Sequence, residues 1–213
     1  SRLSCERHNF TRLALFHLPI FGEGIVIPDT LISNEPSQIL EFAKKHNGKL
    51  IAKALYSPLI EEPDEDIFVF TNVIDINELK EEDEIRISPS IFQQPLNPKT
   101  DYRVTVIGDT VYPVRITRQS EESLESIDWR TDKTDLDFSA CTLPEEIEHM
   151  CRQIVKDGGL IFGAIDLVQY DGKFYFLEIN PNGEWGWLQQ PFGIPIAGTL
   201  CDLMLEHDGN QGA

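Results

Sequence analysis

Two apolar segments interrupted by a few polar residues constrain this chain more than any other feature of its sequence. The segments run over residues 160–170 and 173–180, and an Asp-Gly pair at 171–172 separates them. Apolar runs of this length around Asp-Gly predict an antiparallel β-hairpin. Polar residues inside such strands are candidates for a functional site. The interrupting residues are Asp166, Glu178 and Asn180.

These polar residues can form one site only if they point to the same face of the hairpin. Glu178 and Asn180 are two apart on one strand and therefore share a face. A strict two-residue turn would pair Asp166 with Leu177 and place it on the opposite face, whereas a three-residue loop would pair it with Phe176. The sequence therefore predicts an odd-length loop. Two carboxylates and an amide on one face suit Mg²⁺, and the alternative is ordinary polar residues facing solvent.

The other strands are expected in hairpins or as separate short segments. Gly108-Asp109 separates apolar stretches and predicts a second hairpin. The polar stretch 119–140 is predicted to be a loop. The expected strands cover residues 50–55, 67–71, 102–107 and 110–117.

Three helices follow from apolar residues at helical spacing. Asn34 is predicted as the N-cap of the first helix, and Thr142 to Glu145 as a capping box for the second. The third is expected at residues 195–206. Hairpins with separated helices favour an α+β fold over a doubly wound parallel sheet.

The composition excludes several functional classes. A formal net charge of −18 does not fit a nucleic-acid-binding surface, which needs basic patches. No run of about 18 apolar residues is present to span a membrane, and the first residues do not form a signal peptide. The four cysteines have no zinc-site spacing and are interpreted as reduced thiols of a cytoplasmic protein.

The hairpin motif resembles the metal-binding signature of the ATP-grasp ligases. The resemblance rests on Ala164-Ile165-Asp166 followed by Leu177-Glu178-Ile179-Asn180-Pro181. It implies the ATP-grasp fold, with a lid subdomain and a C-terminal antiparallel-sheet subdomain. It also implies that Asp166, Glu178 and Asn180 bind Mg²⁺ ions that bridge the phosphates of ATP.

Further segments follow in the order of that family. Lys53 resembles the strand lysine that contacts an ATP phosphate. The residues around Gln94 and Leu96 resemble the hinge whose backbone meets the adenine. Asp101 and Arg103 resemble the acid-x-Arg motif at the start of the C-terminal sheet. The resemblance thus assigns cofactor contacts to Lys53, Gln94, Leu96 and Asp101, and a catalytic role to Arg103.

A narrower resemblance, over roughly residues 28–206, is to the ATP-grasp macrocyclases that mature graspetides. Asp128-Trp129-Arg130 and the Gly-x-Trp piece before Leu188 are its most discriminating parts. It implies a precursor peptide with leader and core as substrate, side-chain ester or amide links as products, and Arg130 as a second catalytic arginine. A homodimer is kept open as a further arrangement. Trp185 and Trp187 are expected either to wall the pocket or to pack in the core.

The resemblance divides the chain into three parts. Residues 1–27 are expected to be the remnant of an N-terminal segment, residues 28–92 the lid, and residues 93–213 the catalytic subdomain. Two other readings stay open. Arg115 and Arg118 leave room for a glutamate-ligase-type enzyme acting on a small molecule or protein tail. A truncated module that binds nucleotide or peptide without turnover is supported by the missing N-terminal domain and the missing lysine near residues 6–9.

Overall fold

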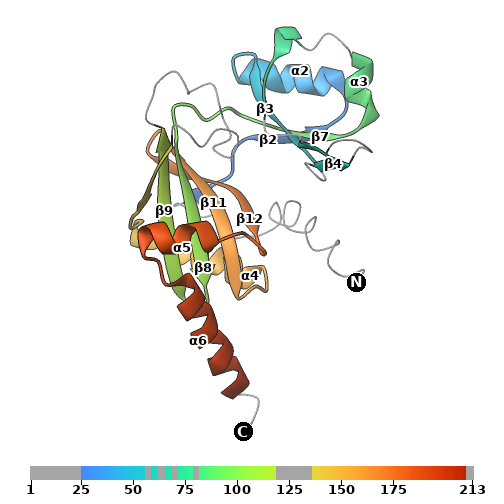
Figure 1. Ribbon diagram of the computed structural model, residues 1–213. Coiled ribbons are helices and arrows are strands. Elements are labelled where there is room, and N and C mark those ends of the chain that lie inside the picture. The colour runs from blue at the N-terminus through green and yellow to red at the C-terminus, as the bar shows by residue number, and fades with distance from the viewer. Residues whose placement is uncertain are drawn as a thin grey trace. The chain divides into compact units, whose positions relative to one another are not determined.

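The computed structural model describes residues 25–55, 59–61, 66–68, 72–78, 82–118 and 136–209. The expectations for residues 1–24 and for Arg130 lie outside these ranges. The described residues form two compact units (Figure 1), which are described one at a time. Within the described ranges, the first contains residues 25–26, 99–117 and 137–209, and the second contains the described residues between 27 and 98 together with 118 and 136.

The first unit is built on a six-stranded sheet. Its strand order is β1-β12-β11-β8-β9-β10, in which β1 runs parallel to β12 and the pairs β12–β11, β11–β8 and β8–β9 are antiparallel. The residues 136–140 form a strand at the edge of this sheet, so the predicted loop over 119–140 is wrong at its end. The strands are β1 (Ile25–Val26), β8 (Thr100–Ile107), β9 (Thr110–Arg118), β10 (Leu136–Ala140), β11 (Phe162–Tyr170) and β12 (Lys173–Asn180).

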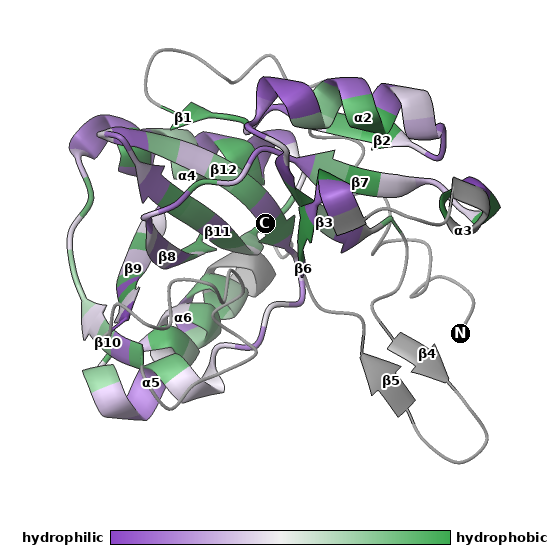
Figure 2. Ribbon diagram, turned by 90° about the horizontal axis from the view of Figure 1, so that it is seen from above, coloured by the Kyte–Doolittle hydropathy of each residue, from purple (hydrophilic) through white to green (hydrophobic). Residues whose placement is uncertain are grey.

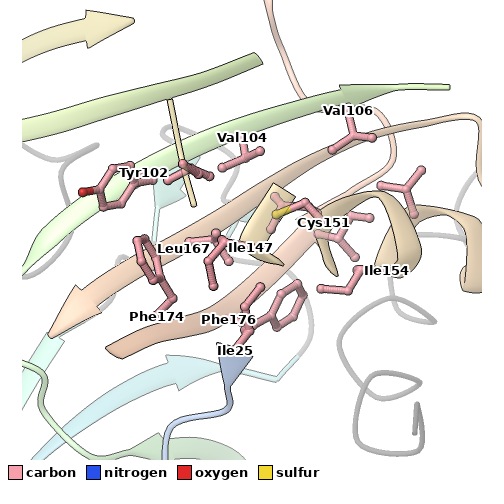
Figure 3. Packing of buried hydrophobic residues seen from close by; sticks show 14 residues of the cluster. Ile25, Tyr102, Val104, Val106, Ile147, Cys151, Ile154, Leu167, Phe174 and Phe176 are labelled. Carbon is pink, nitrogen blue, oxygen red and sulfur yellow. The ribbon is translucent and has the colours of Figure 1, made fainter. Parts of the chain in front are cut away.

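One face of this sheet packs against helix α4 (Glu145–Asp157). Alternate residues of β8, β11 and β12 contribute apolar side chains to this core, and α4 contributes Ile147, Cys151, Ile154 and Val155. Figure 3 shows Cys151 and Ile154 among the sheet residues, with Tyr102 and Phe174 nearby. The rings of Tyr102 and Phe174 lie 5.6 Å apart. This core uses one face of each strand, and the residues between point to the other face.

The opposite face is apolar only in part. Helices α5 (Gly186–Phe192) and α6 (Ile196–Gly209) belong to a second core with Ile107, Val114, Leu188, Ile194 and Ile196. In Figure 1, α5 lies over β8 and β9 on the side of the sheet away from α4. Trp185 and Trp187 are partly buried and pack against this core, as the core alternative predicts. No helix of the described residues is long and apolar enough to cross a membrane.

The second unit has a four-stranded antiparallel sheet covered on one face by a helix. The sheet order is β2-β7-β3-β6, and α2 (Pro36–Lys45) packs its Ile39 and Ala43 against Leu50 and Phe92. Figure 2 shows hydrophobic and hydrophilic residues on different sides of α2. The other elements are β2 (Thr30–Ser33), β3 (Lys49–Ala54), β4 (Leu59–Glu61), β5 (Asp66–Phe68), β6 (Asn72–Asp75), η2 (Ile76–Glu78), α3 (Glu82–Ile87) and β7 (Ser90–Gln93).

The two predicted helix caps are wrong, although the helices they were assigned to are present. The N-cap of α2 is Glu35, and the Asn34 side chain instead donates a hydrogen bond to the carbonyl oxygen of Arg86 at 3.0 Å. The N-cap of α4 is Pro144, without a side-chain cap bond. Three glutamates in the first turn of α4 interact favourably with the helix dipole there instead. The α+β prediction itself is confirmed.

Candidate functional site

The three polar residues of the hairpin share a face, as predicted, but by a different route. The loop has two residues, because Tyr170 pairs directly with Lys173. Asp171 and Gly172 have φ angles of 48° and 73°, which defines the primed turn that Asp-Gly favours. The prediction of an odd-length loop is therefore wrong.

A β-bulge restores the shared face. Leu167 pairs with Phe176 and Asp166 pairs with Glu178, so Leu177 is an extra residue on β12. One extra residue changes which side chains point to which face beyond it. Glu178 consequently lies directly opposite Asp166, and Asn180 lies opposite Ala164 on the same face.

The neighbouring strand β8 adds a buried cation to this face. Arg103 pairs with Asp166 across the sheet, and its Nη1 donates to Asp166 Oδ1 at 2.7 Å. Arg103 is 7% exposed and Asp166 is 4% exposed, so the ion pair is almost fully removed from solvent. Asp101 lies two residues before Arg103 on the same face and forms an ion pair with Lys99. Of the sequence-predicted residues, this sheet brings together Asp101, Arg103, Asp166, Glu178 and Asn180.

A turn after β12 packs closely over this face. The N–H of Gly183 donates to the carbonyl oxygen of Asn180 at 3.3 Å. A Cβ on Gly183 would lie 2.4 Å from the Cβ of Ala164 and 3.0 Å from Nη2 of Arg103. The N–H of Asn182 donates to Oδ1 of Asn180 at 2.9 Å and fixes the orientation of that carboxamide. Glycine is therefore required at position 183 for close approach of the turn to the sheet.

Asp166, Glu178 and Asn180 offer oxygen donors, which suit Mg²⁺. Within the described ranges, no three His, Cys, Asp or Glu side chains are grouped closely enough to hold a metal ion. Mg²⁺ uses few carboxylates and completes its coordination with water and phosphate oxygens. On the neighbouring strand β8, Nε of Arg103 and Oγ1 of Thr105 are buried and have no hydrogen-bond partner among the described residues. Buried polar groups normally have a hydrogen-bond partner. These two atoms can therefore form hydrogen bonds to a polar ligand on this face of the sheet.

The second unit carries the residues expected to contact the nucleotide. Lys53 and Ile91 are directly paired on β3 and β7, as are Ile51 and Gln93, so all four point to the sheet face away from α2. Gln94 follows β7 directly, and its N–H donates to the carbonyl oxygen of Asp29 at 3.0 Å. Leu96 is buried two residues further on. Lys53 thus lies in this sheet on β3, and Gln94 and Leu96 follow the end of its strand β7.

Sequence reasoning missed Thr105 and the close packing at Gly183. Thr105 lies two residues after Arg103 and opposite Ala164, and it is fully buried. The alternation Asp101, Arg103, Thr105 on one strand was a usable signal, because polar residues two apart share a face. The contact between Gly183 and Ala164 joins residues on different elements and had no local signal.

The fold defined by these two units is that of the ATP-grasp ligases. The chain is similar to a RiPP-associated ATP-grasp ligase of Chryseobacterium gregarium, with 29% identity, a TM-score of 0.82, and coverage of 96% of this chain and 62% of that one. That structure is a complex with ADP, a leader and a core peptide. The predicted resemblance to graspetide macrocyclases is confirmed at the level of these structural neighbours.

Two further solved structures are similar to the chain at lower sequence identity. Macrocyclase MdnC of Microcystis aeruginosa MRC, bound with precursor peptide MdnA, has 25% identity, a TM-score of 0.76, and coverage of 95% of this chain and 61% of that one. A D-alanine–D-alanine ligase of Bacillus anthracis has 15% identity, a TM-score of 0.56, and coverage of 85% and 62%, and it shares the fold alone. The neighbours are ligases, in agreement with the predicted enzyme class. The chain spans less than two thirds of the length of each.

No family model and no curated protein matches the sequence.

Proposed function

We propose that the chain is the catalytic part of an ATP- and Mg²⁺-dependent ligase that forms side-chain ester or amide links in a precursor peptide. The observation that carries the proposal is the bulge at Leu177, which places Glu178 and Asn180 on the same face as the Arg103–Asp166 ion pair. A bulge is a feature of local geometry that commonly redirects side chains next to active sites. The 29% identity to a ligase whose structure is a complex with a leader and core peptide supports a peptide as substrate.

Each residue then has a role that its chemistry allows. Asp166, Glu178 and Asn180 would hold Mg²⁺, which when bound neutralises phosphate charge and orients the phosphates. Lys53 would add positive charge at the phosphates, and Asp101 would support the cofactor site from the start of β8. The Gln94 and Leu96 backbone would contact the adenine. These contributions are mainly positioning and charge neutralisation, as expected for phosphoryl transfer.

The reaction has two balanced steps. A carboxylate oxygen of the peptide attacks the γ-phosphorus of ATP, the bond from that phosphorus to the bridging oxygen breaks, and ADP leaves. A hydroxyl or amine of a second side chain then attacks the acyl carbon, phosphate departs, and the nucleophile loses its proton to phosphate or solvent. Arg103 and Arg130 would stabilise the negative oxygen that develops on the acyl group.

The nucleotide site is tested by calorimetric titration with a non-hydrolysable ATP analogue, with and without Mg²⁺. We expect binding that requires Mg²⁺ and that falls by about tenfold or more in Glu178→Gln, which keeps the shape of the side chain and removes its charge. Glu178→Gln is preferred to a change at Asp166, because losing the Asp166 carboxylate also removes the ion-pair partner of Arg103. Mg²⁺-independent binding, or equal binding by the variant, would refute the assigned metal ligands.

Mass spectrometry separates the peptide macrocyclase from the glutamate-ligase reading. A precursor-like peptide encoded beside the gene is incubated with the protein, ATP and Mg²⁺. Each internal ester or amide link removes one water from the peptide mass, whereas ligation of a free amino acid adds the mass of that residue. Nucleotide binding without any mass change, and without ATP hydrolysis, would instead identify a non-catalytic binding module.

A further inference from the structure

Three hydrogen bonds tie the strand end at Gln93-Gln94 to Asp29, which precedes β2, and to Thr30, which begins it. The N–H of Gln94 donates to the carbonyl oxygen of Asp29 at 3.0 Å, and the N–H of Asp29 donates back to Oε1 of Gln94 at 3.1 Å. Nε2 of Gln93, whose side chain is buried, donates to Oγ1 of Thr30 at 3.0 Å. The Gln94 side chain therefore completes a reciprocal pair that continues the β2–β7 ladder past the end of β7.

The hydroxyl of Thr30 completes this arrangement. It accepts from Gln93 and donates to the carbonyl oxygen of Pro28 at 2.7 Å. Pro28, Asp29 and Thr30 thus hold both glutamines, and Thr30 is the one residue of these three that belongs to a strand. We call these bonds the hinge clamp, formed by Pro28, Asp29 and Thr30 on one side and Gln93 and Gln94 on the other.

The clamp uses the N–H of Gln94 and leaves its carbonyl oxygen for another partner. Among the described residues, the structure shows no hydrogen-bond partner for that oxygen or for the N–H of Leu96. Pro95 lies between them, so it offers no competing N–H and restricts Gln94 to extended conformations. An acceptor and a donor two residues apart are thereby presented on a backbone fixed from the other side.

We infer that the Gln94 side chain and the Thr30 hydroxyl position the hinge backbone and thereby set a preference for adenine over guanine nucleotides. This inference rests on the proposed function, in which the Gln94 and Leu96 backbone meets the base. Adenine offers an amino donor beside a ring-nitrogen acceptor, whereas guanine offers a carbonyl acceptor beside an N–H donor, the reverse pattern. A fixed hinge rejects guanine because both of its hinge groups would face a like partner, and a loosened hinge loses part of that discrimination.

The test compares the dissociation constants of ATP and GTP analogues, each with Mg²⁺, in the wild type and four variants. Gln94→Met removes the acceptor for the Asp29 N–H while keeping a long side chain, and Thr30→Val removes the hydroxyl at nearly constant volume. We expect each to lower the ATP-over-GTP preference by about tenfold, the factor that corresponds to one lost hydrogen bond. Gln94→Glu keeps an acceptor oxygen and should retain the preference.

Ser33→Ala is the matched control on the same strand. The Ser33 hydroxyl accepts from the N–H of Glu35 at 3.0 Å and donates to Gln38 at 2.8 Å, so this variant loses comparable bonds away from the hinge. It should leave the preference unchanged, as would any general loss of stability, which affects both nucleotides alike. A wild-type preference that Gln94→Met and Thr30→Val do not alter would overturn the inference alone. A wild type that binds neither nucleotide would overturn the proposed function and the inference with it.

Discussion

Replacing Gly183 by alanine tests whether the turn after β12 must contact the sheet. The added Cβ would lie 2.4 Å from the Cβ of Ala164, well inside normal van der Waals contact. Neither methyl group can rotate away, since each is bonded directly to the backbone. The second close atom, Nη2 of Arg103 at 3.0 Å, is at the end of a flexible side chain and can move. The clash with Ala164 therefore has to be relieved by movement of the turn or of β11.

The expected effect is on both stability and binding. Overpacking of this kind costs about 1–3 kcal/mol of unfolding free energy. Because the turn is hydrogen bonded to Asn180 and touches Arg103, its displacement also moves two candidate site residues. We expect affinity for the ATP analogue with Mg²⁺ to fall by about tenfold or more. Urea unfolding followed by tryptophan fluorescence measures the first effect, and calorimetric titration measures the second.

A second substitution isolates the contact. Ala164→Gly removes the methyl group that the new side chain meets, so Gly183→Ala should cost far less in that background, with a coupling energy of about 1–3 kcal/mol. Gly186→Ala is the matched control, because a Cβ there meets nothing within 4 Å. If Gly183→Ala cost the same stability with and without the Ala164→Gly change, the reasoning would be refuted.

Three further predictions follow from the hairpin and the core. Deleting Leu177 removes the bulge and should turn the metal-site residues after it to the other face, which abolishes Mg²⁺-dependent nucleotide binding, whereas Leu177→Ala should leave such binding within about threefold of wild type. Asp166→Leu leaves the Arg103 guanidinium buried without its carboxylate and should cost about 3–5 kcal/mol in urea unfolding, much of which Arg103→Met in the same chain should restore. Burial, followed by the nearby Glu148 charge, raises the pKa of Cys151 to about 12. The unfolded thiol ionises near its ordinary pKa, so the stability contribution is fully present below about pH 8.5 and is lost as pH rises toward 12. At pH 10 we expect a loss of about 1.5–2 kcal/mol that Cys151→Val does not show, and parallel stability–pH curves for the two proteins would contradict this.

The strands and helices that follow from local pattern were predictable from the sequence. The hairpins at Gly108-Asp109 and Asp171-Gly172 form as expected, because Gly-Asp and Asp-Gly pairs between apolar runs both favour a two-residue turn. The apolar spacing in α2 and α4 also identified the helices and their buried faces. Arg103 was a site candidate because Asp101-Tyr102-Arg103 resembles the acid-x-Arg motif of the ATP-grasp ligases.

Features that depend on distant partners were not predictable in this way. Asn34 has the composition of an N-cap, yet its side chain donates to the carbonyl oxygen of Arg86, which lies 52 residues away in the sequence. The strand at 136–140 follows a polar stretch and gains its partner only from the sheet edge. The roles assigned to Lys53, Gln94, Leu96 and Asp101 remain predictions, and Arg130 lies outside the described residues. For Asn34 and for the strand at 136–140 the deciding contact is tertiary, and local propensity is a weak guide to tertiary contacts.

The bulge at Leu177 shows how two correct local arguments can give a wrong geometry. Asp171-Gly172 favours a two-residue turn, and a site made of Asp166, Glu178 and Asn180 requires an odd shift between the strands. Loop length is one way to introduce that shift, and a single extra strand residue is another. The structure satisfies both requirements by keeping the short turn and adding Leu177 on β12. The turn therefore keeps the conformation that its residues favour, and the site depends on one half-buried leucine whose position in the chain matters more than its side chain.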